Sequence, residues 1–372
     1  MQFIDLGAQR ARIENKLHAA IAKVIAEGRY ILGPEVAAFE KQIVSYIGVK
    51  HAITCANGTD ALLIPLMAFG IGPGDAVFCP SFTFAATAEV VALVGAEPVF
   101  IDVLPDTYTM DPAQLKKTVT MIQNEGRLKP KAIIPVDLFG LSADYNAIST
   151  VALEEKLFLI EDAAQSIGGI RDNIMCGAFG NVAATSFYPA KPLGCYGDGG
   201  AIFTDNDDLA AIMRSILFHG RGETQYENIR IGLNSRLDTI QAAILIEKLA
   251  ILEDEINKRS HIAACYDEGL KDVVKVPTIP NACRSAYAQY TIQAEDRDGL
   301  QIYLRRNGIP SVVYYVKPLH LQIAYRHFPY AENGLLVSEK LSKEVLSLPM
   351  HPYLSDKDQD KIISSIYNFY KA

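Results

Sequence analysis

The stretch His51-Ala-Ile-Thr-Cys-Ala-Asn-Gly-Thr-Asp60-Ala-Leu-Leu-Ile-Pro-Leu66 carries the pattern that decides the fold. An apolar run over 51–55 leads into the turn Asn57-Gly58-Thr59, and an apolar helical pattern starts at Asp60. This predicts a buried strand, a glycine turn and a helix. Looser copies of the unit follow, with strands predicted at 76–79, 98–103, 132–136, 157–160 and 183–187. Because most of these runs do not alternate, they indicate parallel strands buried on both faces and an α/β fold.

The rest of the chain extends this pattern on both sides. Helical spacing of apolar residues predicts a helix that stops at Gly28 and a second from Pro34 to Gly48. Further helices are expected at 207–217 and 237–256. From about residue 257 the sequence pattern predicts an α+β arrangement, with strand candidates at 289–292 and 311–315. We therefore expect a large domain over 1–256, a smaller one over 257–372, and packing of the N-terminal helix on the smaller domain.

Composition narrows the class of protein. The chain has 372 residues, 49% of them hydrophobic and 21% charged, which indicates a globular protein. A formal net charge of -8 disfavours nucleic acid or an anionic membrane as the main partner. Six scattered cysteines without a C-x-x-C pair, and histidines without metal-ligand spacing, predict a reducing cytoplasmic setting and no metal site. No apolar run approaches about 18 residues, so no spanning helix is expected.

Lys191 is the most informative single residue. It follows the apolar run 183–187 and precedes the glycine-rich turn Gly197-Asp-Gly-Gly200. A desolvated lysine tends to lose its proton, and the free amine can then form a Schiff base with a carbonyl cofactor. The alternative is a lysine whose stem lies along a loop while its ammonium stays in water.

Other polar residues follow the predicted strands. Gly58 and Thr59 begin a helix, and the N-terminus of a helix can bind a phosphate. The same residues are also common where a helix is simply capped and binds no ligand. Asp162 follows the run 157–160 and could hold a protonated ring nitrogen or, again, cap a helix. Ser186 offers a second hydroxyl to an anion.

Two phenylalanines, Phe82 and Phe84, follow the strand predicted at 76–79. One of them could stack on a planar cofactor, although core packing is the more common use of an aromatic ring. Together, a small hydroxyl turn, an aromatic ring, a strand-end carboxylate, a serine and a lysine are what pyridoxal 5'-phosphate requires.

Several motifs in this order resemble one family, the DegT/DnrJ/StrS sugar aminotransferases, a branch of the fold type I pyridoxal-phosphate enzymes. The resemblance covers nearly the whole chain. It runs through Tyr30-Ile-Leu-Gly-Pro-Glu35, Asn57-Gly-Thr-Asp-Ala-Leu62, Pro80-Ser-Phe-Thr-Phe-Ala-Ala-Thr87, Glu161-Asp-Ala-Ala-Gln-Ser166, Ser186-Phe-Tyr-Pro-Ala-Lys191 and Gly232-Leu-Asn-Ser-Arg-Leu-Asp238. It implies a large domain with a mostly parallel central sheet flanked by helices, and a smaller C-terminal α+β domain.

The resemblance also implies roles for individual residues. Lys191 would form the Schiff base, and Asp162 would pair with the pyridine nitrogen. Gln165 would contact the phenolic oxygen of the cofactor, and Phe84 would stack on its ring. Phosphate contacts are implied for Gly58, Thr59 and Ser186, and across a subunit boundary for Asn234. An obligatory homodimer with shared active sites would follow, unless Asn234 only forms a turn or cap before the helix at 237–256.

The substrate is implied by finer features. The turn Gly197-Asp-Gly-Gly200, where many family members have Gly-Glu-Gly-Gly, and the segment Ser347-Leu-Pro-Met-His-Pro-Tyr353 are similar to one group of these enzymes. That group aminates C3 of UDP-2-acetamido-2-deoxy-3-oxo-glucuronate for O-antigen and lipopolysaccharide synthesis. L-glutamate would be the donor, 2-oxoglutarate the by-product and pyridoxamine 5'-phosphate the intermediate form of the cofactor. The candidates for contact with the UDP-sugar, each of which could equally be a surface or packing residue, are Tyr30, Arg236, Tyr315, Lys317 and His320.

Three other readings stay open at this level. The enzyme could aminate another keto sugar, either dTDP-3-keto or UDP-4-keto. It could be a sugar dehydratase, but that branch of the family carries histidine where this chain has Lys191. It could also be a regulatory relative without catalysis, which an intact set of cofactor residues disfavours.

Overall fold

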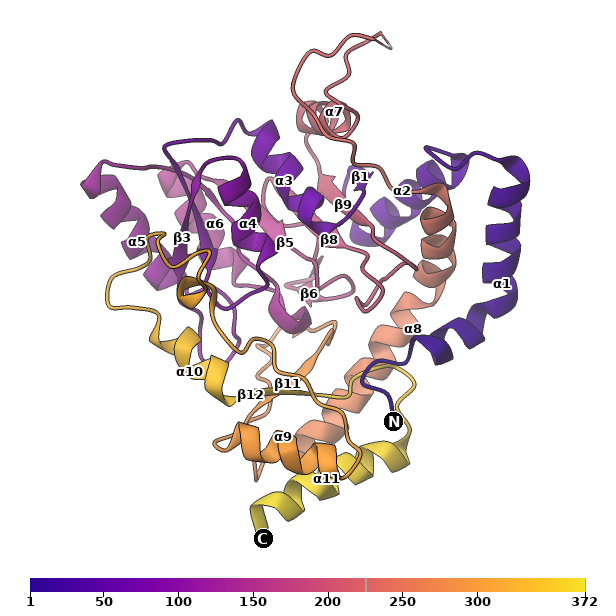
Figure 1. Cartoon of the computed structure of the whole chain (residues 1–372), viewed down its shortest axis with the longest axis vertical. Helices are drawn as coiled ribbons and strands as arrows, with labels where there is room; N and C mark the ends of the chain where they lie inside the picture. The colour runs from indigo at the N-terminus through magenta and orange to yellow at the C-terminus, as the bar shows by residue number, and fades with distance from the viewer. Residues whose placement is uncertain (225, 372) are drawn as a thin grey trace.

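A computed structural model describes residues 1–224 and 226–371 and has a seven-stranded sheet at its centre (Figure 1). In spatial order the strands are β1 (His51–Cys55), β9 (Gly200–Thr204), β8 (Val182–Ser186), β5 (Phe158–Asp162), β4 (Lys129–Ile133), β2 (Asp75–Pro80) and β3 (Glu97–Ile101). The five strands from β8 to β3 are parallel, whereas β9 runs antiparallel to both of its neighbours. This confirms the predicted α/β fold with a mostly parallel central sheet.

Helices cover both faces of this sheet because successive residues of each strand point to opposite sides. On β2, Val77 and Cys79 pack in the layer that holds α3, α4 and α7, whereas Ala76 and Phe78 pack against α5 and α6. α2 and α8 cover the neighbouring part of the second face. These helices are α2 (Pro34–Ile47), α3 (Gly58–Ala68), α4 (Ala86–Leu93), α5 (Pro112–Glu125), α6 (Tyr145–Glu155), α7 (Asp207–Ile216) and α8 (Thr239–Leu270).

The predicted ends of the first two helices are confirmed. α1 (Leu6–Glu27) stops at Gly28, and α2 stops at Gly48, with φ values of 68° and 86°. Residues with a side chain rarely adopt this left-handed conformation, so glycine is the natural terminator at both positions.

Two strand assignments needed correction. β9 was not predicted, because it begins at Gly200, the last glycine of the turn, and only three apolar residues, 201–203, follow before Thr204. The strand expected at 311–315 is wrong: only Val312 pairs, through a single bridge to Ser347. That segment contains four consecutive β-formers, yet its pairing with β12 (Val345–Leu348) is limited to this one residue pair.

The C-terminal part packs around its own apolar core. A two-stranded sheet of β11 (Tyr290–Gln293) and β12 (Val345–Leu348) packs with α9 (Arg297–Arg306) and α11 (Asp356–Lys371). α10 (Leu336–Glu344) and the short helices η1 (Leu138–Gly140) and η2 (Leu319–Leu321) lie in the connections. A separate small sheet is formed by β10 (Cys283–Arg284), β6 (Ile170–Arg171) and β7 (Ile174–Met175).

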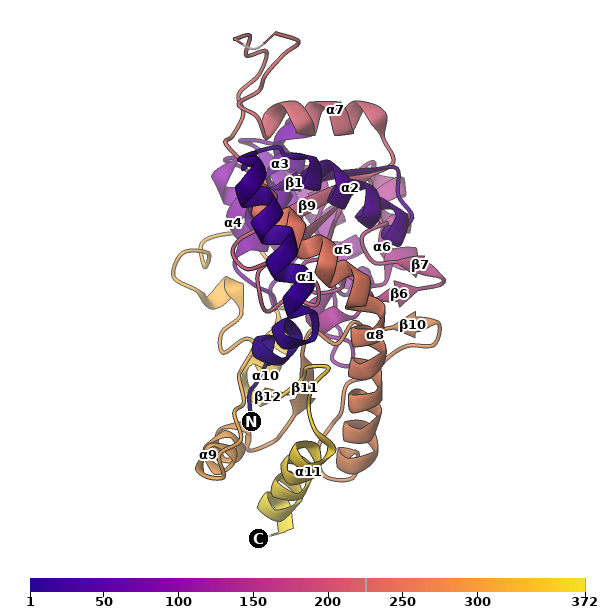
Figure 2. The same ribbon diagram turned by 90° about the vertical axis from the view of Figure 1, so that its right-hand side faces the viewer.

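We propose that the chain divides into two domains near residue 256. α8 is continuous through this position, yet Ile256 packs in the core of the large sheet and Ile262 packs in the C-terminal core. α1 lies along α8, and the N-terminus reaches the C-terminal part, where the Met350 amide donates to the carbonyl of Phe3 (Figure 2). In the described part of the chain, no helix is both long and apolar enough to cross a membrane.

Candidate active site

Asp162 is the last residue of β5 and is almost completely buried, with 5% of its surface exposed. The hydroxyl of Thr87 donates to its carboxylate at 3.0 Å, and the amide of Ala164 donates at 3.2 Å. Burial raises the pKa of Asp162 to about 6, against the opposing effect of these two donors and of Lys191. The carboxylate therefore holds a proton, or pairs with a cationic group, more readily than an exposed aspartate does.

Lys191 lies in the turn that follows β8, with its amide donating to the carbonyl of Tyr188 at 2.9 Å. The side chain is half-buried. Desolvation lowers the pKa of its amine, while the nearby carboxylate of Asp162 acts in the opposite direction. The two groups thus influence each other, as expected for residues at the carboxyl ends of the adjacent parallel strands β5 and β8.

Ser186, at the end of β8, lies against the first turn of α3. A side-chain carbon built at Gly58 would stand 2.6 Å from the Ser186 Cβ, so the close approach of the two segments depends on this glycine. Asn57 caps the helix by accepting from the Asp60 amide at 2.8 Å, so Thr59 is not its cap. Gly58, Thr59 and Ser186 therefore meet at a helix N-terminus, where an anion is favoured.

Replacing Gly58 with alanine should push Ser186 out of place. We expect weaker binding of pyridoxal phosphate, measured by absorbance titration, together with a stability loss of about 1–3 kcal/mol from overpacking. Gly72→Ala is the matched control, since its added carbon would meet only the Val94 carbonyl at 3.7 Å. Unchanged cofactor affinity in the Gly58 variant would argue against this phosphate position.

Gln165 is buried one turn beyond Asp162. Its Oε1 accepts from the Phe139 amide at 2.7 Å, which leaves Nε2 directed to the hydroxyl of Tyr315 at 3.5 Å. Burial raises the pKa of Tyr315, so its hydroxyl stays protonated. The structure therefore brings Gln165 and Tyr315 together beside Asp162, although they are 150 residues apart in the chain.

Phe82 and Phe84 lie in different environments. Phe82 is fully buried and packs edge-on against Tyr315, with ring centroids 6.1 Å apart. Phe84 has 59% of its surface exposed and is free to stack on a planar ligand. Of the two rings, only Phe84 fits the stacking role.

The remaining candidates come from other segments of the chain. Tyr30, Asn234 and Lys317 are exposed, and the guanidinium of Arg236 lies over the ring of Phe218, 5.0 Å from its centroid. His320 is buried, with Nδ1 2.7 Å from the Ser81 hydroxyl and Nε2 3.3 Å from a carboxylate oxygen of Glu339. Their contact with substrate stays a prediction.

Sequence reasoning missed Thr87, which holds the Asp162 carboxylate. The residue stands in the quoted motif Pro80-Ser-Phe-Thr-Phe-Ala-Ala-Thr87 but was given no function. Its position in the first turn of α4, at the carboxyl end of a parallel strand, was the available signal, because ligand sites of open α/β sheets form there.

These groups fit pyridoxal phosphate. A desolvated amine, a buried carboxylate with a raised pKa and a helix N-terminus packed against a serine hydroxyl match its aldehyde, ring nitrogen and phosphate. A mostly parallel sheet with this set at its strand ends defines a fold type I pyridoxal-phosphate enzyme.

The chain belongs to the DegT/DnrJ/EryC1/StrS aminotransferase family, whose model matches residues 11–367. It is 47% identical to the UDP-2-acetamido-2-deoxy-3-oxo-D-glucuronate aminotransferase of Pseudomonas aeruginosa, over 99% of this chain and 100% of that protein. It is 38% identical to the UDP-N-acetyl-3-dehydro-alpha-D-glucosamine 3-aminotransferase of Acidithiobacillus ferrooxidans, over 98% and 96%.

Solved structures support the same family. A DegT DnrJ EryC1 StrS aminotransferase from Brucella abortus matches with a TM-score of 0.99 and 70% identity, over the whole of both chains. The ntda protein from Bacillus subtilis with bound cofactor pmp matches with a TM-score of 0.88 and 29% identity, over 100% of this chain and 83% of that one. The predicted family, aminotransferase class and pyridoxal-phosphate dependence are therefore confirmed.

Proposed function

We propose that this enzyme transfers the amino group of L-glutamate to C3 of UDP-2-acetamido-2-deoxy-3-oxo-glucuronate. One observation carries the proposal: the 47% identity to an aminotransferase named for that substrate extends over essentially the full length of both proteins. The Acidithiobacillus relative, whose name also places the amine at C3 of a UDP-sugar, supports the same position and nucleotide. The dTDP-3-keto and UDP-4-keto alternatives are less favoured by these two relatives.

Lys191 is the proposed catalytic base and acid. Desolvation lowers the pKa of its amine, which makes the amine a better proton acceptor than that of an exposed lysine. In the first half-reaction Lys191 removes the proton from Cα of L-glutamate, and 2-oxoglutarate leaves after hydrolysis. In the second it returns a proton, which ends on C3 of the sugar. When bound, pyridoxal phosphate supplies the electron sink and carries the amino group, as pyridoxamine phosphate, between the two substrates.

The other residues hold the cofactor. Asp162 keeps a proton on the ring nitrogen, and its burial strengthens that charge pairing because little water screens it. Gln165 and Phe84 orient the ring through its phenolic oxygen and its face. Gly58, Thr59 and Ser186 bind the phosphate, so that the aldehyde faces Lys191.

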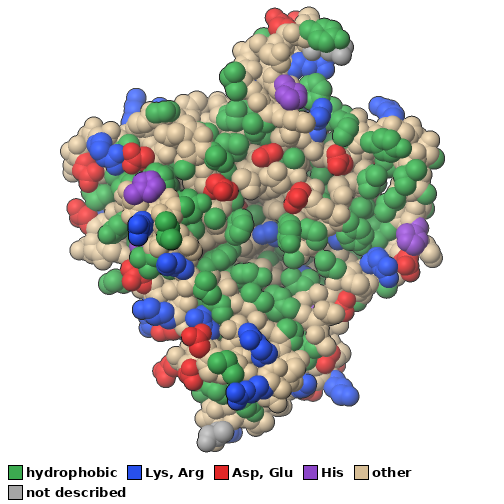
Figure 3. Space-filling view, viewed as in Figure 1, with side chains coloured by type: hydrophobic (Ala, Val, Ile, Leu, Met, Phe, Trp, Pro, Cys, Tyr) green, Lys and Arg blue, Asp and Glu red, His purple; other side chains and the backbone are tan. Residues whose placement is uncertain are grey.

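We propose a homodimer in which Asn234 completes the phosphate site of the neighbouring subunit. Asn234 is exposed, and its backbone pairs with Phe218 at the base of the loop that projects from the molecule (Figure 1). Hydrophobic side chains gather over the middle of the face in Figure 3, around a hollow. Exposed apolar residues near the site segments include Ile31, Leu32, Tyr188, Ile229 and Ile231. A dimer would cover such residues, and light scattering should give twice the mass of the chain.

Substrate contacts are proposed for Arg236, Lys317, Tyr30 and Tyr315, because a diphosphate and a uronate need cations or donors. His320 is the weakest candidate while both of its ring nitrogens are engaged. We further propose a cytoplasmic enzyme of O-antigen and lipopolysaccharide synthesis. All six cysteines are unpaired, which is typical of a reducing compartment.

The decisive experiment runs the reaction in reverse with 2-oxoglutarate as acceptor. It compares the UDP-linked 2-acetamido-3-amino uronate with the matching sugar that lacks the carboxylate. Loss of one charged hydrogen bond should lower kcat/KM by roughly 10–100-fold for the second sugar. Equal values would reject the uronate, and turnover of dTDP-sugars alone would reject the UDP-linked class.

A further inference from the structure

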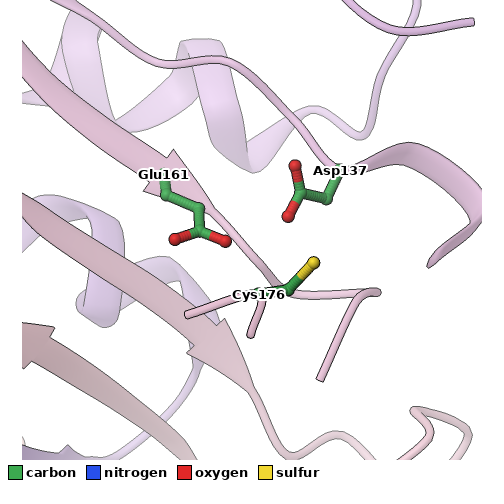
Figure 4. Close-up of side chains that lie close together, drawn as sticks. All are labelled: Asp137, Glu161 and Cys176. Atoms are coloured by element: carbon green, nitrogen blue, oxygen red, sulfur yellow. The ribbon is translucent and has the colours of Figure 1, made fainter. Parts of the chain in front are cut away.

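A buried group of three side chains includes Glu161, the residue before Asp162 on β5, and Figure 4 shows these three side chains close together. Asp137, Glu161 and Cys176 are each fully buried, and one oxygen of each carboxylate and the Cys176 Sγ all lie within 4.8 Å of one another. Glu161 immediately precedes Asp162 on β5, so the two carboxylates point to opposite faces of the strand. The function assigned above uses none of these three residues.

Every oxygen of the two carboxylates already accepts a hydrogen bond. Glu161 accepts from the amides of Gly177 and Phe179, at 2.7 and 2.8 Å. Asp137 accepts from the Ala143 amide and the Tyr145 hydroxyl on Oδ1, and from the Ser166 hydroxyl on Oδ2, at 2.9, 3.0 and 2.7 Å. The group therefore has the spacing of metal ligands, but its oxygens are committed to donors within the protein.

Two carboxylates this close in an apolar interior cannot both be ionised, because each charge opposes the other. Over residues 1–224 and 226–371, neither forms a salt bridge that would compensate for a second charge. Burial, and then the neighbouring Asp137, raise the pKa of Glu161 well above its usual range. Burial also raises the pKa of Asp137, but its three donors favour the ionised form. Three donors to Asp137 against two to Glu161 favour the charge on Asp137 and the proton on Glu161.

Asp137 is attached to both ends of the segment that carries the cofactor residues. Its amide donates to the carbonyl of Asp162 at 3.1 Å, and its carboxylate receives the hydroxyl of Ser166 at 2.7 Å. Gln165 lies between these two attachments. A shift of Asp137 would therefore move Asp162 and Gln165 together.

We propose that Asp137 and Glu161 share a single proton, carried by Glu161, and that the pair positions Asp162 and Gln165 against the cofactor ring. Both are positioning residues, since neither reaches the ligand. The inference rests on the proposed roles of Asp162 and Gln165.

The test compares two substitutions of Asp137 in the full-length enzyme. In Asp137→Asn the amide oxygen can still accept from Ala143 and Tyr145, and the single negative charge can pass to Glu161. The bond to Ser166 is kept in reversed direction, because the new NH2 group donates to the serine hydroxyl. Asp137→Ala leaves the donors of Asp137 unpaired. We expect the dissociation constant of pyridoxal phosphate to stay within about threefold for the first and to rise roughly 10–100-fold for the second.

Two further variants separate positioning from general loss of stability. In Glu161→Gln the new NH2 group replaces one of the two oxygens that accept from Gly177 and Phe179, so it faces a backbone donor and cofactor affinity should fall more than in Asp137→Asn. Tyr145→Phe keeps the ring stacked on Phe179 but removes a donor to Asp137. It should lower the melting temperature of the cofactor-free protein while leaving cofactor affinity unchanged.

The visible spectrum adds a readout that a purely structural role would not move. The pH at which the absorbance of bound cofactor changes should shift in Asp137→Ala and be restored in Asp137→Asn. The titratable groups that face the pair are Asp162, Tyr145 and Cys176, with Lys191 beyond Asp162. If Asp137→Ala does not fold, Ser166→Ala, which removes only the side-chain attachment, takes its place.

Wild-type affinity and spectrum in Asp137→Ala would overturn the positioning role. Equal losses in Asp137→Asn and Asp137→Ala would overturn the shared proton. Failure of the proposed function would look different, because the wild-type protein would then still bind the cofactor but would not turn over the UDP-linked uronate.

Discussion

Replacing Lys191 with alanine should lower transamination by at least roughly 10²–10⁴-fold, the usual contribution of one general acid–base group. The physical reason is that the same amine moves the proton in both half-reactions. Rates of formation of 2-oxoglutarate and of the aminated sugar should fall together. Binding of pyridoxal phosphate should persist more weakly, since Asp162 and the phosphate residues are untouched.

Lys248 provides the matched control. It is the other lysine with a strongly lowered pKa, about 8, and burial is again the main cause. Its ammonium, however, donates to the Gly194 carbonyl and lies 4.5 Å from the centre of the Tyr196 ring. Lys248→Met should therefore lose stability but keep turnover in the folded fraction. Turnover that survives in the Lys191 variant and disappears in the Lys248 variant would reverse the assignment.

Replacing Asp162 with asparagine should lower turnover by roughly 10²–10³-fold, the scale for removing one preorganised electrostatic contact. A neutral amide cannot keep the ring nitrogen protonated, so the cofactor withdraws electrons less strongly. The variant should still bind the cofactor, and its reduced rate should appear in kcat more than in KM. Wild-type kcat in Asp162→Asn would show that another group protonates the ring.

The same substitution should stabilise the cofactor-free protein. The pKa of Asp162 is about 6 when folded, above its ordinary value of 3.8, so its favourable contribution is complete below pH 3.8 and lost as pH rises through 6. The difference corresponds to about 3 kcal/mol, which asparagine does not lose. Urea unfolding at pH 8 and pH 4 measures it, with the exposed Asp272→Asn as the charge control. An equal effect at both pH values would contradict the raised pKa.

Most of the fold follows from local sequence. Strands β2, β5 and β8 are largely apolar because helices cover both of their faces, and such runs stand out without any knowledge of pairing. β4 shows the limit of this signal, since it begins at Lys129, three residues before the apolar run predicted at 132–136, and ends at Ile133. Strand β9 does not, since a five-residue run after a glycine-rich turn becomes a strand only when β1 and β8 lie on either side of it. Residues 311–315 show the reverse case, in which suitable residues lie beside β12 but pair with it only at Val312.

Some residues of the candidate site could likewise be predicted from the sequence, and others could not. Lys191, Asp162 and Ser186 can be recognised from the sequence because they stand at or just after the ends of predicted strands. The carboxyl ends of parallel strands meet at one edge of the sheet, where ligands bind. The residues that contact them cannot be recognised from the sequence, since they come from distant segments of the chain. Thr87 supports Asp162 from α4, and Asp137 meets Glu161 from an irregular segment after β4. Pairings of this kind depend on tertiary packing, and no spacing rule in the sequence identifies them.

One measurement tests the central assignment most directly. The purified protein is loaded with pyridoxal phosphate, which should absorb near roughly 410 nm, then reduced with borohydride, digested and analysed by mass spectrometry. We predict one modified peptide, with the cofactor attached to Lys191. Attachment to Lys248 or to several surface lysines, or failure to take up the cofactor, would contradict this assignment.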